Sequence, residues 1–364
     1  MKNNKYSNFK IFHFPEKLNS FKERRITAPI YVRIKPINLC NHGCFFCTYS
    51  TGFRVKDGAE EPHIDSQMHQ NMKEKDSIPK DKLIEILEDL QLLGVKAITW
   101  SGGGEPLMHR GIVEAINFAA DIGLDQSIIT NGHLLFGDRA EALKAAKWVR
   151  VSMDYTDGEQ LKRFRNVSED GFDEILWNMS EFAKKKPADC DLGVNYIIHK
   201  GNWANLERFS RELKNLGVEN IRFSPMYVPD FQEYHAPFHR QVMEQLAKIQ
   251  ELCDDKFTVN STYSIDASGP QGKHRAYQTC YVMQTIPVIG ADLNVYACHN
   301  KAYDDTGLIG SIKDRRFHEL WYHPDTWEKM ITWDAQKMCQ HECANDRKNI
   351  LLNDFINAST DNFV

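Results

Sequence analysis

The feature that most constrains the fold is a repeated alternation of short apolar segments with amphipathic segments between residues 30 and 226. Residues 79–93 predict a helix, because leucine and isoleucine recur at helical spacing, Pro79 fits its first turn and Gly94 fits its C-terminal cap. The same reasoning predicts strands at 30–37, 96–100, 125–129, 148–153, 192–198 and 221–224, and helices at 112–122, 138–146, 172–184, 204–216 and 242–252.

Six strand–helix units in series predict parallel strands with helices outside them. We expect an α/β protein with a partial (β/α)6 TIM-like barrel, followed by a small C-terminal domain with a β-hairpin. A doubly wound sheet is the alternative fold, but the glycine run 102–104 lacks the G-x-G-x-x-G spacing of a dinucleotide site.

Three cysteines follow the first predicted strand at C-x3-C-x2-C spacing, namely Cys40, Cys44 and Cys47. A loop at a strand end can bring three sulfurs to one point. Three thiolates on a [4Fe–4S] cluster leave one iron open, and an open coordination position is typical of a catalytic metal. A zinc loop or a group of buried thiols remains the alternative, although structural zinc prefers four ligands.

The next strand end carries Gly103-Gly104-Glu105-Pro106, and Phe46 precedes the third cysteine. Together and in this order, these motifs resemble the radical S-adenosylmethionine (SAM) superfamily over residues 30–226. The resemblance implies a [4Fe–4S] cluster on the three cysteines, with SAM chelated to the open iron and cleaved by an electron from the cluster. The protein would then bind and orient the reactants, while the cofactors carry the chemistry.

The resemblance also implies SAM contacts near the strand ends. Glu105 is expected to accept a hydrogen bond from the SAM ammonium group, and polar side chains after later strands are expected near the ribose or carboxylate. The full set of predicted SAM contacts is Phe46, Gly103, Gly104, Glu105, Asn131, Ser152, Asp154 and Arg165. The alternatives are a tight turn for the glycines, turn chemistry for Asn131 and a solvated helix charge for Arg165.

Four further cysteines lie in the C-terminal part of the chain: Cys280, Cys298, Cys339 and Cys343. Residues 287–297 predict a β-hairpin between the first two, so two cysteine pairs can close a four-sulfur site. This resembles the twitch form of the SPASM domain and implies a second, auxiliary [4Fe–4S] cluster, although Leu293 stands where a glycine is common. A structural zinc site and unligated thiols are the alternatives.

Composition limits the other possibilities. The 364 residues carry 45 basic and 50 acidic side chains, which argues against a nucleic-acid surface. No apolar run is long enough for a membrane span, no signal peptide is evident, and nine cysteines favour a reducing compartment, so we expect a cytoplasmic protein. The predicted division is a lead-in at 1–28, the radical SAM barrel at 29–230, a connecting helix and linker at 231–279 and the auxiliary-cluster domain at 280–364.

These motifs predict a radical SAM oxidoreductase that takes hydrogen from a small hydroxylated molecule such as a sugar, nucleotide sugar or aminocyclitol. We expect a two-electron alcohol oxidation, or an epimerisation or dehydration, with flavodoxin or ferredoxin as electron donor. Maturation of a peptide or protein is the first alternative, and a non-catalytic zinc or electron-transfer protein is the second. By position, the substrate-side candidates are Asn195, His199, Ser224, Tyr227 and Asp230.

Overall fold

The computed structural model describes residues 7–49, 69–228, 230–264, 275–339 and 343–359. The long loop predicted at 48–76 lies largely outside the described residues, as does most of the loop predicted at 266–278.

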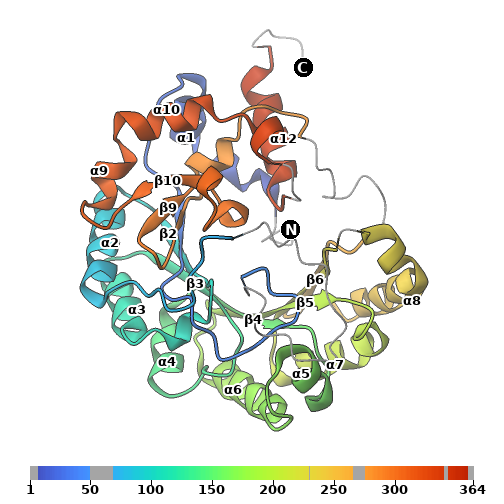
Figure 1. Ribbon diagram of the computed structural model, residues 1–364. Coiled ribbons are helices and arrows are strands. Elements are labelled where there is room, and N and C mark those ends of the chain that lie inside the picture. The colour runs from blue at the N-terminus through green and yellow to red at the C-terminus, as the bar shows by residue number, and fades with distance from the viewer. Residues whose placement is uncertain (1–6, 50–68, 229, 265–274, 340–342, 360–364) are drawn as a thin grey trace.

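Seven parallel strands form the wall of an incomplete barrel (Figure 1). They are β1 (Tyr31–Ile34), β2 (Ala97–Trp100), β3 (Asp125–Thr130), β4 (Trp148–Met153), β5 (Asp191–Ile198), β6 (Asn220–Pro225) and β7 (Thr258–Ser261). The sheet runs β10-β9-β8-β1-β2-β3-β4-β5-β6-β7, and β7 and β10 end it without pairing to each other. The predicted partial barrel is therefore confirmed.

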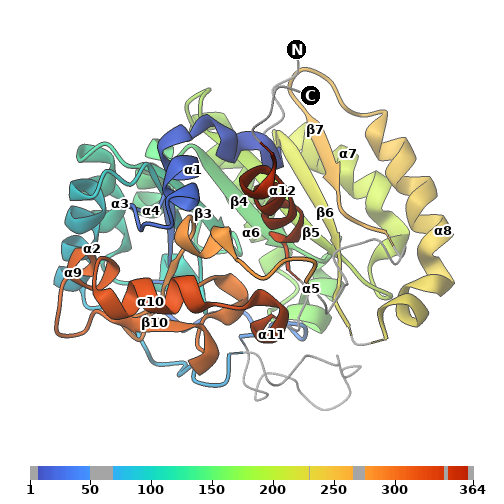
Figure 2. The ribbon, with the colours of Figure 1, turned by 90° about the horizontal axis from the view of Figure 1, so that it is seen from above.

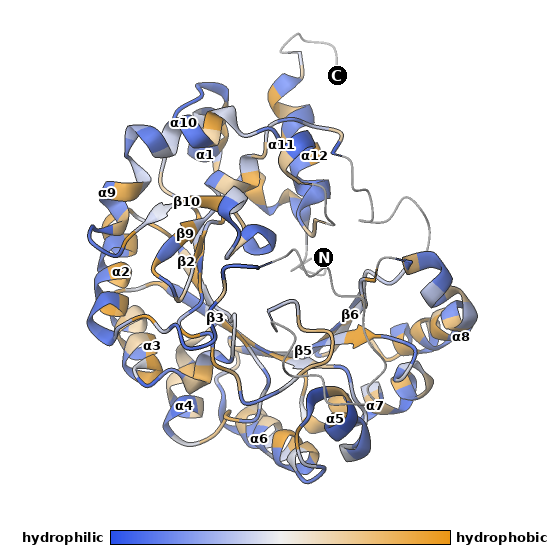
Figure 3. Cartoon of the chain, viewed as in Figure 1, coloured by the Kyte–Doolittle hydropathy of each residue, from blue (hydrophilic) through white to orange (hydrophobic). Residues whose placement is uncertain are grey.

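Helices cover the outer face of the strands. They are α2 (Lys80–Leu92), α3 (Ile112–Asp121), α4 (Gly137–Ala142), α5 (Gly158–Arg165), α6 (Gly171–Lys185), α7 (Leu206–Leu216) and α8 (Phe231–Gln250). Figure 3 shows hydrophobic and hydrophilic stretches on the same helices, as expected when one face packs on a sheet and the other meets solvent. Gly94 and Gly217 end α2 and α7 with positive φ angles of 73° and 103°, a conformation that favours glycine.

The six predicted strand–helix units are present, with two additions. Helix α5 and strand β7 were not predicted, and α8 begins well before the predicted residue 242. Helix α5 is strongly polar, and only Leu161, Phe164 and Arg165 in it are buried. Helix α5 is also short and strand β7 has no buried residue, so neither segment contains the apolar residues by which the other elements are recognised in the sequence.

The C-terminal part continues the same sheet. The predicted hairpin is formed by β8 (Val288–Ile289) and β9 (Asn294–Tyr296), and β10 (Leu308–Ser311) pairs antiparallel with β9. Strand β8 lies parallel to β1 and so attaches this part directly to the barrel. In the hairpin turn Leu293 has a φ of 62°, which explains why related turns use glycine there.

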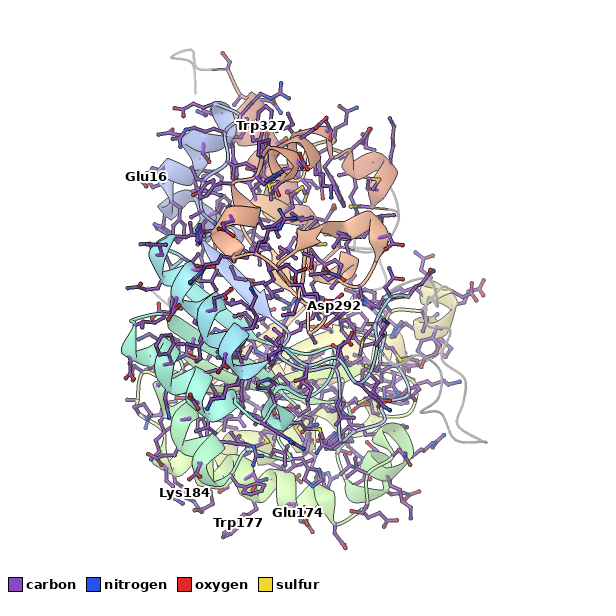
Figure 4. The ribbon with its side chains drawn as sticks, turned by 60° about the vertical axis from the view of Figure 1, so that its left-hand side comes forward. Glu16, Glu174, Trp177, Lys184, Asp292 and Trp327 are labelled. Atoms are coloured by element: carbon purple, nitrogen blue, oxygen red, sulfur yellow. The ribbon has the colours of Figure 1, made fainter. Side chains whose placement is uncertain are left out.

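Helices surround this hairpin: α9 (Phe317–Trp321), α10 (Pro324–Thr332), α11 (Ala335–Met338) and α12 (Asp346–Asn357). Helix α12 lies beside α1 (Pro15–Lys22) from the N-terminal segment (Figure 2), and Leu18 and Phe21 share an apolar cluster with Leu352. Figure 4 shows this part, marked by Trp327, at the opposite end of the molecule from α6, marked by Trp177 and Lys184.

Short 3-10 helices connect several elements: η1 (Asn8–His13), η2 (Pro106–Met108), η3 (Leu143–Ala145), η4 (Trp203–Asn205), η5 (Tyr281–Gln284), η6 (His299–Lys301) and η7 (Asp305–Gly307). Over the described parts of the chain, no helix combines the length and apolar character that crossing a bilayer requires.

Candidate active site

The loop with the first three cysteines follows β1 and lies against the C-terminal end of α5. The backbone N–H of Gly43 donates to the carbonyl of Arg165 at 2.7 Å, and that of Phe45 donates to the carbonyl of Phe164 at 3.0 Å. On another side, the Asn131 Nδ2 donates to Asn41 Oδ1 at 2.7 Å. Contacts from two distant segments therefore fix the loop that presents Cys40, Cys44 and Cys47.

The three thiols of this loop act on one another electrostatically. Burial raises the pKa of the Cys44 thiol; Arg165 opposes this effect, whereas Asp154, Cys47 and Cys40 add to it. Metal binding needs the thiolate form, and a cationic cluster supplies the charge that makes deprotonation favourable. A group of three half-buried thiols beside an arginine therefore fits an iron–sulfur cluster.

The four C-terminal cysteines also form one group: Cys280 and Cys298 precede η5 and η6, Cys339 follows α11, and Cys343 lies shortly before α12. Burial raises the pKa of the Cys298 thiol, and Cys280, Cys343 and Cys339 raise it further. Burial raises the pKa of the Cys280 thiol to about 12, and the neighbouring Cys339 adds to this effect. The Asn349 Nδ2 donates a hydrogen bond to the Cys280 sulfur at 3.3 Å. All nine cysteines are free thiols, so none of these sulfurs is lost to a disulfide.

The number of thiols in each group matches a [4Fe–4S] cluster, in which each cysteine bonds to a different iron: three cysteines leave one iron open and four close the cluster. Zinc instead draws its ligands onto one centre, at about 2.3 Å for sulfur, and prefers four ligands in a structural site.

The glycine run after β2 lies against the start of the cysteine loop. A Cβ on Gly104 would stand 2.0 Å from the carbonyl oxygen of Leu39, and one on Gly103 would stand 2.3 Å from Asn38 Oδ1. The Gly104 N–H donates to the carbonyl of Ile37 at 3.1 Å. Gly104 thus allows close packing of two backbone segments, and Gly103 leaves room for the Asn38 side chain; the contact of these glycines with SAM stays a prediction.

The Glu105 carboxylate is buried and ties β2 to β3. It accepts hydrogen bonds from Thr130 Oγ1 at 2.7 Å, the Asn131 N–H at 2.7 Å and the Leu107 N–H at 3.1 Å. Burial raises its pKa, and these three hydrogen bonds partly offset the effect. Since a carboxylate accepts about four hydrogen bonds, one position is left for the SAM ammonium group, which stays a prediction.

Asp154 and Arg165 form a fully buried ion pair beneath the cysteine loop. The Arg165 Nε lies 2.5 Å from Asp154 Oδ1, and their side chains are 3% and 0% exposed. Burial acts to raise the pKa of Asp154, but Arg165 and then His199 outweigh it, so the pKa lies below its usual value. Arg165 is therefore not a solvated helix charge, and its carbonyl also anchors Gly43.

The remaining predicted SAM contacts are dispersed. Ser152 lies two residues before Asp154 on β4 and pairs in register with Asn195 of β5. Phe46 contacts Phe45 edge to face, with ring centroids 5.3 Å apart. Whether they contact SAM stays a prediction.

Sequence reasoning missed a set of polar groups between the two cysteine groups. Lys35 Nζ donates to the Tyr49 hydroxyl at 2.8 Å, and that hydroxyl shares a hydrogen bond with His299 Nδ1 at 3.1 Å. Burial and Arg33 lower the pKa of Lys35, while Cys47 opposes them. The place of Tyr49 two residues after Cys47 is the sequence signal that could have indicated this link.

Comparisons with known proteins agree with this geometry. Residues 34–209 match the family model described as Radical SAM superfamily. The chain is 25% identical over 202 residues to a probable GTP 3′,8-cyclase of Saccharolobus islandicus, a match that covers 54% of this chain and 56% of the relative. The chain thus spans about half the length of that relative.

Two other proteins match over more of the chain. The mycofactocin maturase MftC of Mycolicibacterium smegmatis is 23% identical over 317 residues, which covers 85% of this chain and 74% of the maturase. The crystal structure of Streptococcus suis SuiB bound to S-adenosylmethionine superposes with a TM-score of 0.62 and 14% identity, over 94% of this chain and 80% of SuiB. At that identity the likeness to SuiB shows a shared fold.

Proposed function

This chain belongs to the radical SAM superfamily, whose members use a [4Fe–4S] cluster and SAM, and from that premise we propose that it oxidises a small hydroxylated molecule. The proposed substrate is a sugar, nucleotide sugar or aminocyclitol. An alcohol carbon would lose a hydrogen atom, then one electron and the hydroxyl proton, so the product is a ketone. Methionine and 5′-deoxyadenosine would form once per turnover.

One observation carries this proposal: seven thiols gather into two groups that both adjoin β1. The cysteine loop with Cys47 leaves the end of β1, and β8 of the hairpin that precedes Cys298 pairs with the same strand. Burial acts to lower the pKa of Arg33 on β1, while Tyr31, Tyr49 and Cys298 raise it, so Arg33 lies within electrostatic reach of the second group.

The two groups differ in the number of sulfurs. Cys40, Cys44 and Cys47 would leave one iron open for SAM, whereas four cysteines would close the second cluster. When bound, the first cluster supplies the electron that splits SAM into methionine and a 5′-deoxyadenosyl radical, and the second supplies an acceptor for one electron. A flavodoxin or ferredoxin is the proposed electron donor. A closed second cluster favours an oxidation over a redox-neutral reaction.

The residues of the chain itself position the cysteine loop and the substrate. The Asp154–Arg165 pair and Asn131 hold the cysteine loop in place. The substrate is expected at the C-terminal ends of the strands, where this fold places its reactive groups. On two neighbouring strands, Asn195 lies beside Arg222 in the middle of β5, and Ser224 lies beside Ile197 near the end of β6.

The test is anaerobic turnover of the reduced holoenzyme with SAM and candidate alcohols deuterated at the reacting carbon. The expected result is deuterium in 5′-deoxyadenosine together with one ketone per SAM consumed. Label transfer without a ketone would replace oxidation by epimerisation or dehydration. Zinc without iron in the anaerobically purified protein, together with no SAM cleavage, would overturn the proposal of an enzyme.

A second candidate function is maturation of a peptide. It is favoured by the match to mycofactocin maturase MftC, which covers more of this chain than the cyclase match does. SuiB, which shares the fold, has been crystallised with its precursor peptide SuiA. Incubation with candidate precursor peptides, followed by mass spectrometry, would distinguish the two: a SAM-dependent mass change in a peptide replaces the small-molecule proposal.

A further inference from the structure

A row of polar side chains crosses four neighbouring strands of the barrel. The register places Ser152 on β4 beside Asn195 on β5, Asn195 beside Arg222 on β6, and Arg222 beside Asn260 on β7. Adjacent strands lie about 4.8 Å apart, so these side chains are direct neighbours on one face of the sheet. We refer to these four residues as the polar row.

The polar row faces the barrel interior. The residues that alternate with it along the strands, Val151, Tyr196 and Phe223, are buried in the main apolar core. Tyr196 contacts Phe209 of α7, so this alternate set points to the outer helices, which lie outside the strands in Figure 1. Because successive side chains of a strand point to opposite faces, Arg222 and its neighbours point inward.

Such a row is unusual for a barrel interior, which bulky branched apolar side chains normally fill. Here Ser152, Asn195, Arg222 and Asn260 are all partly exposed. The Nε of Arg222 and the Oδ1 of Asn195 are nevertheless buried atoms that have no hydrogen-bond partner within the described part of the chain. Buried polar atoms are nearly always paired, so this row has hydrogen-bonding capacity that the described protein does not use.

The strands that carry the polar row present positively charged side chains to the barrel interior. Arg150 faces the same interior two residues before Ser152, with its guanidinium 4.6 Å from the Trp148 ring. Asp191 on the same face lies four residues before Asn195 and so about 13 Å from it along the strand. Asp154, beyond the row, is already paired with Arg165.

We propose that Arg222, the cationic residue of the polar row, binds an anionic oxygen group of the substrate, a carboxylate or a phosphate. Arginine presents a planar fork of donors that matches either group. Asn195 and Asn260, on each side of it, bind hydroxyl or amide groups of the same molecule. This inference rests on the proposed function and narrows its substrate class to acidic or phosphorylated hydroxyl compounds.

The test uses two anion probes on the unreduced holoenzyme, inorganic phosphate and malonate, titrated calorimetrically in the presence of saturating SAM. Saturating SAM occupies the site for the SAM carboxylate, so a remaining anion site is a different one. Wild-type protein should bind at least one probe, which identifies the preferred group. The variant Arg222→Met should bind it roughly tenfold or more weakly, and Arg222→Lys should recover part of the loss.

Arg211→Met is the matched control, because Arg211 is an exposed arginine of α7 that pairs with Glu207. It should bind the probe as the wild type does. Asn195→Ala provides a second test that keeps the positive charge of Arg222. It should weaken binding of the anion probe less than Arg222→Met does. Failure of both probes to bind wild-type protein, or equal binding by Arg222→Met, would overturn the inference.

The inference and the proposed function fail separately. The wild type and the Arg211→Met control should bind SAM and, once reduced, form 5′-deoxyadenosine slowly without substrate. Loss of anion binding in Arg222→Met, with SAM binding retained in the same titration, supports the row as a substrate site. Absence of SAM cleavage in the wild type would instead overturn the proposed function.

Discussion

The buried ion pair beneath the cysteine loop allows a quantitative prediction. Replacing Asp154 by Asn leaves the Arg165 guanidinium, whose side chain is 3% exposed, without its anionic partner. Breaking a buried pair by removing one partner costs about 3–5 kcal/mol, because the remaining charge has lost both water and counter-charge. We therefore expect Asp154→Asn to lower the free energy of unfolding by about 3 kcal/mol or more.

A variant in which both Asp154 and Arg165 are replaced separates the cost of burying an unpaired charge from the cost of altered packing. Arg165→Met alone leaves a buried carboxylate, for which His199 Nε2 at 3.8 Å is only a distant partner. Asp154→Asn with Arg165→Met removes both charges, so it should be more stable than the sum of the single losses predicts, by about 2–3 kcal/mol. That difference measures the interaction of the pair.

The assay is anaerobic urea denaturation of the wild type, the two single variants and the double variant under one set of conditions. Glu207→Gln is the control, because its partner Arg211 is 54% exposed, and it should change the free energy by at most about 0.5 kcal/mol. An Asp154→Asn variant as stable as wild type, or single losses that simply add in the double variant, would refute the reasoning.

Three further predictions concern the clusters and the pH dependence of stability. Cys44→Ala should abolish formation of 5′-deoxyadenosine by the reduced protein, measured by chromatography, and an undiminished rate would contradict the cluster assignment. Cys298→Ala should lower the iron content from about eight to about four atoms per chain and leave SAM cleavage without substrate intact; an unchanged iron content would show that Cys298 is not a ligand. Burial lowers the pKa of His235, which hydrogen-bonds the Met226 carbonyl at 2.9 Å. Its contribution to stability is therefore present above about pH 6.5 and lost as the pH falls through the lowered value. His235→Gln should accordingly lose less stability than wild type between about pH 7.5 and 5.5 in urea titrations, and an identical loss would refute this assignment.

Part of the fold was predictable because its signals are local. The helix at 79–93 was evident from apolar residues at helical spacing, and Gly94 and Gly217 mark helix ends where the backbone takes a positive φ. The hairpin of β8 and β9 followed from two short apolar runs around a turn. In each case neighbours in the sequence are also neighbours in space.

Other parts were not predictable, because distant residues stabilise them. Helix α5 has a polar sequence, and what fixes its end is the cysteine loop, whose Gly43 and Phe45 donate to its last carbonyls. Strand β7 is short and has no buried side chain; its hydrogen bonds to β6 place it in the sheet. The contacts of Tyr49 were not predictable either, since nothing local shows that Lys35 and His299 meet its hydroxyl.

By itself the sequence determined the order of strands and helices and the spacing of the cysteines, because both depend on residues a few positions apart. Only the tertiary structure decided that Arg165 is buried against Asp154 rather than solvated. It alone decided that Arg222 stands between two asparagines inside the barrel. Such arrangements depend on which distant segments the closing sheet brings together, and no local pattern in the chain records that.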